Sequence, residues 1–214
     1  MKRHDDAVVA AVKADLEKLA AEEAQRTAPD PFVGELEDGD REVVAEIASL
    51  LEPVDPPTSL RERLLSSTMQ GRLARFAAPV AKLLDVDDAR AEALLDGIDD
   101  PASWSPSPVP GMVLYHFEGG EKVADCITGF TRIARGGAFP EHEHLGTEYV
   151  LVVQGRVRDG VSGEIYGPGD LSIMEAGTSH DLEVLPGPAL VYLVVIFDGI
   201  RLGGVEFRPG DPRI

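Results

Sequence analysis

Residues 136–155 read GGAFPEHEHLGTEYVLVVQG, and this stretch decides how the second half of the chain folds. His142 and His144 are two residues apart, and side chains at this spacing point to the same face of a β-strand. Glu148 follows four residues later and can reach the same point after a turn or from the start of the next strand. Because imidazole and carboxylate groups together suit divalent first-row metals, the stretch predicts a metal site built on a sheet.

The chain after Gly111 reads as a series of short β-strands. Its runs are rich in β-branched and aromatic residues and are separated by Gly and Pro turns. The runs are MVLYHF, DCITGFTRIA, TEYVLVVQG, DLSIM, HDLEVL, ALVYLVVIF and LGGVEF. Seven short runs at close intervals predict an antiparallel sandwich or barrel of the jelly-roll kind.

A second motif, GDLSIMEAGTSH at residues 169–180, follows the first. Together the two motifs resemble the signature motifs of the cupin superfamily. The resemblance implies an all-β cupin, a double-stranded β-helix or jelly-roll barrel, over residues 112–214. It also implies one divalent transition metal (Zn, Fe, Mn or Ni, with zinc favoured by the resemblance) held by His142, His144, Glu148 and His180.

The second motif departs from the cupin pattern at two positions that are not ligands in the family. Glu175 stands where proline is usual, and Val184 stands where asparagine is usual. These departures bear on the identity of a ligand at the barrel mouth rather than on the metal. The sequence assigns no catalytic residue, although Glu175 is a candidate general acid or base.

The first hundred residues read as amphipathic helices with one apolar face each. Three apolar stripes at helical spacing and one short helix near Ala89–Asp96, ending at Gly97, are predicted. The stripes are Val8, Val9, Val12, Leu16 and Leu19; Val43, Val44, Ile47, Leu50 and Leu51; and Leu60, Leu64, Leu65, Met69 and Leu73. The proline-rich stretch 101–111 then predicts a connector, so the expected division is a helical module over 1–100, the connector and the barrel.

The segment EVVAEIASLLEPVDPPTSLRERLL, residues 42–65, is similar to the helix–proline–helix stretch of many bacterial anti-sigma factors. A helical anti-sigma module joined to a cupin is the arrangement of the ChrR-like family. That resemblance implies a regulator whose partner is an extracytoplasmic-function sigma factor. The family's usual N-terminal zinc site needs two cysteines, and Cys126 is the only cysteine here.

Two functions therefore stay open at this point. One is a stress-responsive regulator that acts through protein contact and is controlled by the cupin. The other is a metal-dependent cupin enzyme of the dioxygenase, isomerase or hydrolase type on a small molecule. A small-molecule ligand at the metal fits either function.

Charge and composition narrow the possible binding partners and the location of the protein. The formal net charge of −18 argues against direct binding of nucleic acid, whose phosphates such a surface repels. No apolar run is long enough to predict a membrane span, and the charged first residues do not resemble a signal peptide. We therefore expect a cytoplasmic protein, and the cupin resemblance implies a homodimer.

Five further residues have conspicuous side chains but simple expected roles. His4, in a charged terminal segment, is expected to be solvent-exposed without a role. His116 is expected to be an ordinary strand histidine, and Cys126 a small buried apolar side chain. Trp104 is expected to fix the connector to the barrel, and Tyr149 to point away from the face that carries Glu148.

Overall fold

The structure is a computed structural model that describes residues 3–27, 42–43, 46–47, 49–50 and 71–213. Its contacts form two compact units, one of residues 1–19 with 73–214 and the other of residues 20–72. The helices after residue 72 thus belong to the same unit as the strands.

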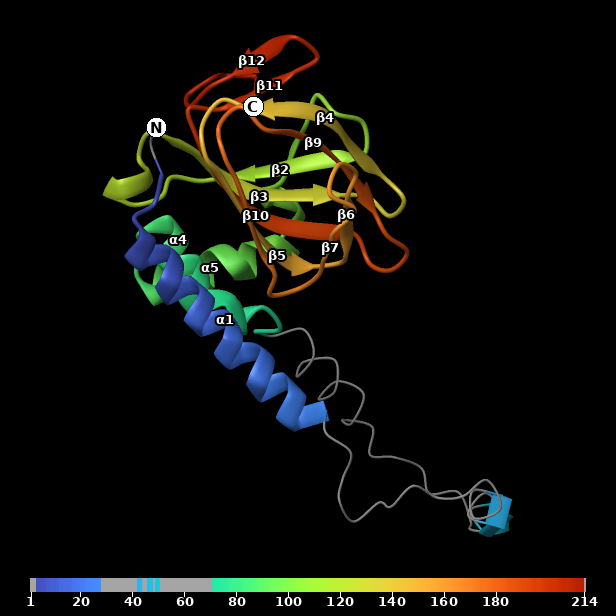
Figure 1. Ribbon diagram of the computed structural model, residues 1–214. Helices are drawn as coiled ribbons and strands as arrows, with labels where there is room; N and C mark the ends of the chain where they lie inside the picture. Colours follow the sequence, from blue (N-terminus) through green and yellow to red (C-terminus); the bar gives the residue numbers. More distant parts are fainter. Residues whose placement is uncertain (1–2, 28–41, 44–45, 48, 51–70, 214) are drawn as a thin grey trace. The chain divides into compact units, whose positions relative to one another are not determined.

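The C-terminal region consists of two six-stranded antiparallel sheets, which confirms the predicted all-β jelly-roll fold (Figure 1). The first sheet has the order β1-β2-β3-β10-β5-β8, and the second has the order β12-β11-β4-β9-β6-β7. The strands are β1 (Ser105–Pro106), β2 (Met112–His116), β3 (Cys126–Ile133), β4 (Ala138–His144), β5 (Glu148–Gln154), β6 (Val157–Asp159), β7 (Ile165–Tyr166), β8 (Leu171–Met174), β9 (Ser179–Val184), β10 (Leu190–Phe197), β11 (Ile200–Leu202) and β12 (Val205–Phe207).

Strand β10 separates two apolar cores, and every one of its residues is buried. Tyr192, Val194 and Ile196 belong to the cluster inside the barrel. Leu193 and Val195 belong to the cluster on the outer face of the same sheet. The two-residue period of a strand explains this alternation, and burial on both faces explains why the run is apolar throughout.

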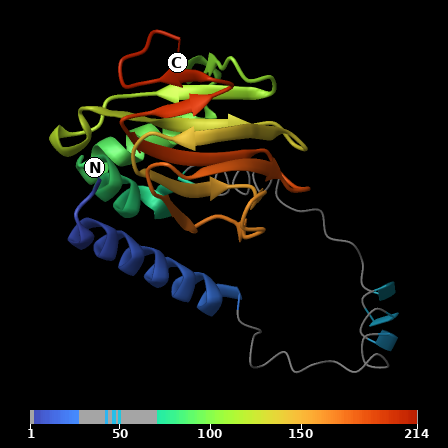
Figure 2. The ribbon, with the colours of Figure 1, turned by 45° about the horizontal axis from the view of Figure 1, so that its top comes forward.

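The outer face is covered by helices (Figure 2). They are α4 (Ala77–Leu84) and α5 (Asp88–Asp96), with short 3-10 turns at Ala74–Phe76 and Gly97–Asp99. Asp87 caps α5 by accepting a hydrogen bond from the Arg90 backbone amide at 2.7 Å. The predicted helix before Gly97 is thus confirmed, whereas α4 was not predicted from the sequence.

The first helix, α1, spans Asp6–Thr27 and confirms the first predicted apolar stripe. Val12 and Leu16 of this helix are buried in the outer-face cluster. The second stripe is only partly described: Val43, Ile47 and Leu50 are helical and exposed, at 54%, 55% and 80%. Residues 51–70, which carry most of the predicted third helix, lie outside the described residues.

The expectation for His4 was wrong. Its side chain is only 4% exposed and its ring packs edge-on against Tyr149 and Phe197, at centroid distances of 4.9 and 5.6 Å. Burial lowers the pKa of His4. The charged neighbours in sequence gave no sign of this, because the apolar surface that covers His4 comes from β5 and β10.

The stretch 101–111 is tied to the barrel by its own short strand and by Trp104. Strand β1 pairs with β2, and the Trp104 indole donates a hydrogen bond to the Ile98 carbonyl at 3.1 Å. The Arg132 guanidinium lies over the indole ring, 4.0 Å from its centroid. The expected role of Trp104 therefore agrees with its contacts. Cys126 is half-buried at the start of β3 and packs against the outer-face cluster.

Gly155 shows why the first motif ends in glycine. Its φ of +78° is a left-handed conformation that side chains disfavour, and an added Cβ would lie 2.8 Å from both the Ala189 carbonyl oxygen and Leu190 Cα. The turn after β5 can therefore pass close to β10 only without a side chain. Among the described residues, the helices are too short or too polar to cross a membrane.

Candidate metal centre

Three strands bring the four predicted residues together inside the barrel. His142 and His144 lie on β4, Glu148 begins β5, and His180 lies on β9. His142 is directly opposite His180 across the β4–β9 pair, and all four side chains are buried. Alternation on β5 turns Glu148 inward and Tyr149 outward, as predicted.

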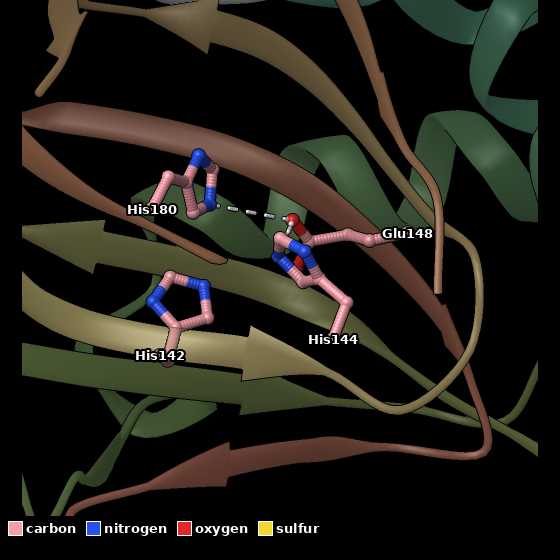
Figure 3. Close-up of side chains that lie close together, drawn as sticks. All are labelled: His142, His144, Glu148 and His180. Carbon is pink, nitrogen blue, oxygen red and sulfur yellow. Dashed lines mark ion pairs between the residues drawn. The ribbon is translucent and has the colours of Figure 1, made fainter. Parts of the chain in front are cut away.

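The four side chains converge on one point (Figure 3). One ligand atom from each residue can be chosen so that all four lie within 4.8 Å of one another. Glu148 Oε2 is 3.2 Å from His144 Nε2 and 3.9 Å from His180 Nε2. The three imidazole rings surround the same space, with centroid separations of 4.7 to 5.1 Å.

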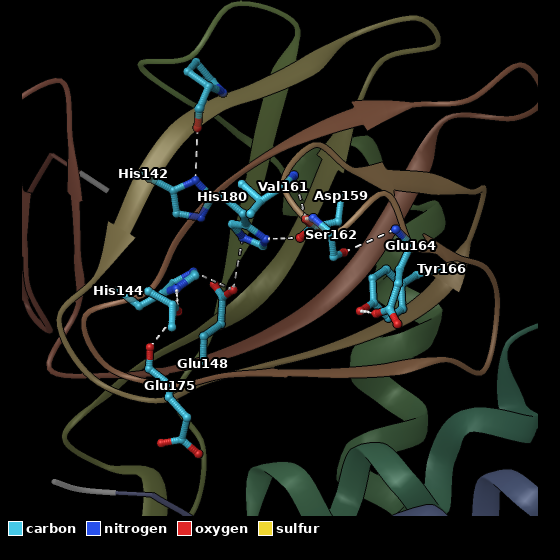
Figure 4. A network of polar contacts seen from close by, with 12 residues as sticks. His142, His144, Glu148, Asp159, Val161, Ser162, Glu164, Tyr166, Glu175 and His180 are labelled. Carbon is cyan, nitrogen blue, oxygen red and sulfur yellow. Dashed lines mark hydrogen bonds and ion pairs between the residues drawn. The ribbon is translucent and has the colours of Figure 1, made fainter.

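Each imidazole is held from behind by a contact at Nδ1 (Figure 4). His142 Nδ1 is 3.0 Å from the Pro140 carbonyl oxygen, and His180 Nδ1 is 2.6 Å from Asp159 Oδ2. His144 Nδ1 is 3.0 Å from the Thr178 hydroxyl, whose hydrogen is donated to the Glu175 carbonyl at 2.7 Å.

These partners decide which ring nitrogen carries the proton. A carbonyl oxygen and an ionised carboxylate only accept, so Nδ1 of His142 and of His180 must donate. The Thr178 hydroxyl has already donated its one hydrogen, so Nδ1 of His144 must donate to it as well. In the neutral form, each ring therefore presents an unprotonated Nε2 toward the centre.

Burial and charge shape the pKa values of the four groups. Burial lowers the pKa of His142 to about 4, so this ring is neutral at neutral pH. For His144, burial acts in the same direction, but the contact with Glu148 outweighs it and raises the pKa. For Glu148, burial would raise the pKa, but the neighbouring histidines lower it and keep the carboxylate ionised.

The donor set fits a divalent transition metal. Nε2 of His144 and Nε2 of His180 are buried without a hydrogen-bond partner in the protein. Buried polar atoms nearly always have a hydrogen-bond partner. Two ring nitrogens that face one point without such a partner are explained by a metal ion that accepts their lone pairs. Neutral imidazoles with Nδ1 held by an outer partner are the usual state of metal-ligating histidines.

Sequence reasoning missed the outer partners Asp159 and Thr178. Asp159 is buried at the end of β6, and its Oδ1 accepts backbone hydrogen bonds from Val161 and Ser162 at 2.9 and 2.7 Å. Since it lies 21 residues before His180, only the β6–β9 pairing reveals its role. Thr178 lies inside the second motif, two residues before His180. This short distance in the sequence could have indicated that Thr178 lies near the ligands.

Glu175 and His116 lie outside this group. The Glu175 carboxylate points away from His144 and Glu148 (Figure 4) and lies 3.7 Å from the Arg3 guanidinium. His116 ends β2 and lines a pocket on the other side of Glu148. The candidate acid or base at Glu175 therefore does not face the centre in this structure.

The fold and the site together define a cupin whose barrel encloses three histidines and one glutamate. Residues 98–196 match the family model of the ChrR cupin-like domain.

Solved structures with a similar fold were also found. A chain in the crystal structure of Rhodobacter sphaeroides SigE in complex with the anti-sigma ChrR is 20% identical, with 92% of this chain and 98% of that chain covered and a TM-score of 0.48. An RmlC-like cupin from Ralstonia eutropha is 23% identical, with 56% and 74% covered and a TM-score of 0.43. An acetylacetone dioxygenase from Acinetobacter johnsonii is 14% identical, with 51% and 82% covered and a TM-score of 0.43. No curated protein sequence matches the chain.

Proposed function

We propose that the chain is a metal-binding regulatory protein of the ChrR type, in which a cupin metal centre accompanies a helical segment that binds a protein partner. Its ligands are His142, His144, Glu148 and His180, and the metal is one divalent transition ion, with zinc the first choice. ChrR, whose name the domain family carries, is an anti-sigma factor that forms a complex with SigE. The proposed partner is accordingly a sigma factor.

One observation carries the metal part of the proposal: three imidazoles and one carboxylate are buried around one point, with Nε2 of His144 and of His180 unpaired. When bound, the ion would supply a Lewis acid and a point of attachment for an exogenous ligand atom. The protein's own residues orient the rings through Pro140, Asp159 and Thr178 and keep water from the site by burial.

Elemental analysis of the purified full-length protein tests this part. We expect about one transition metal per chain in the wild type, and loss of stoichiometric metal in the double variant His142→Ala, His144→Ala. His116→Ala is the matched control, since it removes a histidine outside the group and should leave the metal content unchanged. Full metal in the double variant would overturn the assignment.

Support for the partner comes from the second unit and from charge. The described helical residues Val43, Ile47 and Leu50 recur at three- and four-residue spacing and are more than half exposed, which is the pattern of a helix face that buries itself against another protein. A net charge of −18 favours a partner with a basic surface.

Co-expression pull-down of the full-length chain against the sigma factors of its source organism tests the partner. We expect one sigma factor to be retained and Ile47→Asp to abolish retention, because a charge in an apolar contact must be desolvated. Val161→Asp, at another exposed valine (71%) in the barrel unit, should retain binding. Equal retention by the two variants, or no sigma factor bound by the wild type, would contradict the proposal.

A metal-dependent cupin enzyme is the second candidate, because an apolar pocket reaches Glu148 from inside the barrel. Four protein ligands leave room for substrate at a six-coordinate ion. Glu175, the acid or base that the sequence offered, turns away from the centre, whereas His116 lines this pocket. Oxygen consumption or substrate turnover by the metal-loaded protein would favour this candidate over the regulator.

The predicted homodimer and the cytoplasmic location stay proposals. Multi-angle light scattering of the purified chain tests the first, since a dimer doubles the monomer mass of 22.9 kDa. Localisation of the tagged protein in its source organism tests the second.

A further inference from the structure

The short segment before α1 is held on the outer face of the barrel, opposite the face that carries the metal centre. The His4 backbone amide donates a hydrogen bond to the Tyr149 hydroxyl, and the His4 ring packs edge-on against Tyr149 and Phe197. The Arg3 guanidinium lies 3.7 Å from the Glu175 carboxylate. These contacts fix the start of α1 on β5, on β10 and on the turn between β8 and β9.

The two ring nitrogens of His4 have different surroundings. Among the described residues, Nε2 is buried without a hydrogen-bond partner. The hydrogen bond between the ring and the Leu83 backbone therefore involves Nδ1. Leu83 lies in the last turn of α4, where carbonyl groups have no partner within the helix, so Nδ1–H donates to this carbonyl. The docked ring is thus a neutral imidazole with an unprotonated, buried Nε2.

A second proton on the His4 ring does not fit this position. Protonation would place an N–H at Nε2, where it would be buried without an acceptor among the described residues. It would also bury a positive charge in a side chain that is only 4% exposed. Both costs disappear when the ring moves into water, so protonation favours the released segment.

The charged groups around His4 do not cancel the effect of burial. Asp5 and Asp85 favour the protonated ring, whereas Lys122 opposes it. The Asp85 carboxylate is itself paired with the Lys122 ammonium at 2.9 Å, which weakens its influence on His4. Burial is therefore the largest effect, and it lowers the pKa of His4 from its ordinary value of 6.5.

The remaining attachment of α1 is limited. Val12 and Leu16 are its buried apolar residues, and the rest of its apolar stripe is only partly buried. The ion pair between Asp15 and Lys82 is partly exposed to water and contributes little. Because most of the stability of a surface helix comes from packing, a contact as buried as that of His4 is a large part of what holds α1.

We propose that His4 is a pH-sensitive anchor, which holds α1 on the barrel in its neutral form and releases α1 when it is protonated. Release would expose the apolar outer face of β5 and β10 and the apolar stripe of α1. Docking is strongest above pH 6.5. As the pH falls from 6.5 to the lower pKa of the docked ring, the docking constant decreases by about tenfold per pH unit. This device needs neither the metal nor a protein partner.

Amide hydrogen exchange of the full-length protein, followed by mass spectrometry, measures the release of α1. After correction for intrinsic exchange rates, we expect the protection of α1 in the wild type to fall by up to about tenfold from pH 6.5 to 5.5. His4→Phe keeps an aromatic ring at this position but cannot be protonated, so the protection of its α1 should stay constant. His116→Phe is the matched control, because burial lowers the pKa of His116 as well, and it should respond as the wild type does.

The metal ligands are the same in all three proteins, so their titration does not affect the comparison. An equal pH response of α1 in His4→Phe and in the wild type would overturn the proposal. So would a wild type in which β10 loses protection together with α1, because this result reports unfolding of the barrel rather than release of one helix.

NMR titration of the His4 ring provides a second test, which holds even if His4→Phe does not fold. We expect the ring to titrate below pH 6.5 in the wild type. Val12→Asp places a charge at a buried position and should release α1, so the pKa of His4 should return toward 6.5. Ala14→Asp adds the same charge at an exposed position of α1 and should leave the His4 pKa lowered. A His4 ring that titrates at or above 6.5 in the wild type, or identically in both variants, would refute the anchor.

Discussion

Glu148 and Tyr149 are adjacent in β5, but their side chains point to opposite faces of one sheet and have different roles. Tyr149 packs into the apolar cluster beneath the helices, where His4 and Phe197 contact its ring. Glu148 turns into the barrel and joins three histidines around a point where two ring nitrogens have no protein partner. The outer face is packed mainly with apolar side chains, whereas the inner face gathers four polar side chains at one point.

This contrast teaches that stability and binding are divided between the two faces of the same strands. An outer-face substitution should lower the free energy of unfolding without touching the metal. An inner-face substitution should change ligand affinity with a smaller effect on folding. Substitutions on either face can break this division.

Leu193→Ala should lower the free energy of unfolding by about 3 kcal/mol, because it leaves a cavity in the fully buried outer-face cluster. Chemical denaturation measures the change, and elemental analysis should still find the wild-type metal content. If the variant lost its metal while keeping its stability, the division between the faces would be wrong.

Asp159→Asn should weaken metal affinity by about 10- to 100-fold, because the amide cannot supply the charge that holds the His180 Nδ1–H. Competition with a chelating dye measures this affinity. The matched control is Asp181→Asn, an exposed aspartate on the same strand as His180, which should bind as the wild type does. Equal weakening in both variants would point to a general charge effect instead.

Metal affinity should fall as the pH decreases, and the cause is His144. Glu148 raises the pKa of this ring, so below that raised pKa the metal must displace a proton from it. One displaced proton gives about a tenfold loss of affinity per pH unit. Protonation of His142 does not contribute to this loss of affinity until the pH approaches the pKa of His142, about 4. Dye competition from pH 8 to 5 measures the slope, and a flat profile would contradict the assigned proton positions.

Lys82→Ala should have the smallest effect, a loss of less than about 1 kcal/mol in unfolding free energy. Lys82 pairs with Asp15 of α1, but both side chains are partly exposed and water competes for them. Val12→Ala on the same helix should cost more, since Val12 is fully buried. Thermal unfolding of the two variants compares them, and a larger loss for Lys82→Ala would show that charge rather than burial holds α1.

Much of the fold and of the candidate site could be read from local pattern. The seven apolar runs correspond to β2, β3, β5, β8, β9, β10 and the β11–β12 hairpin, because half-buried strands repeat with a period of two. The spacing of His142 and His144 placed both rings on one face, and Gly155 marked a turn that excludes a side chain. Strand β6 and helix α4 were missed, because each is short and is fixed by what it packs against.

The site shows the same limit. The motifs named its four inner residues, but Asp159 came from a segment without any motif, and His4 was misread as exposed because its neighbours are charged. In both cases the deciding partner lies on a strand distant in sequence. Hydrogen bonds and burial of this kind depend on tertiary pairing, which no local period encodes.

The sequence by itself determined which chemistry this chain carries: three imidazoles and a carboxylate at strand spacing, glycines at the turns and a heavily acidic surface. Only the tertiary structure decided how these groups are arranged and which ring nitrogens carry protons. The pairing of β4 with β9 sets His142 opposite His180, and the outer partners assign the proton on each ring. The barrel wall then leaves a hydrocarbon pocket against Glu148. The physical reason is that residue type is local, whereas burial, proton position and free space arise only where distant strands meet.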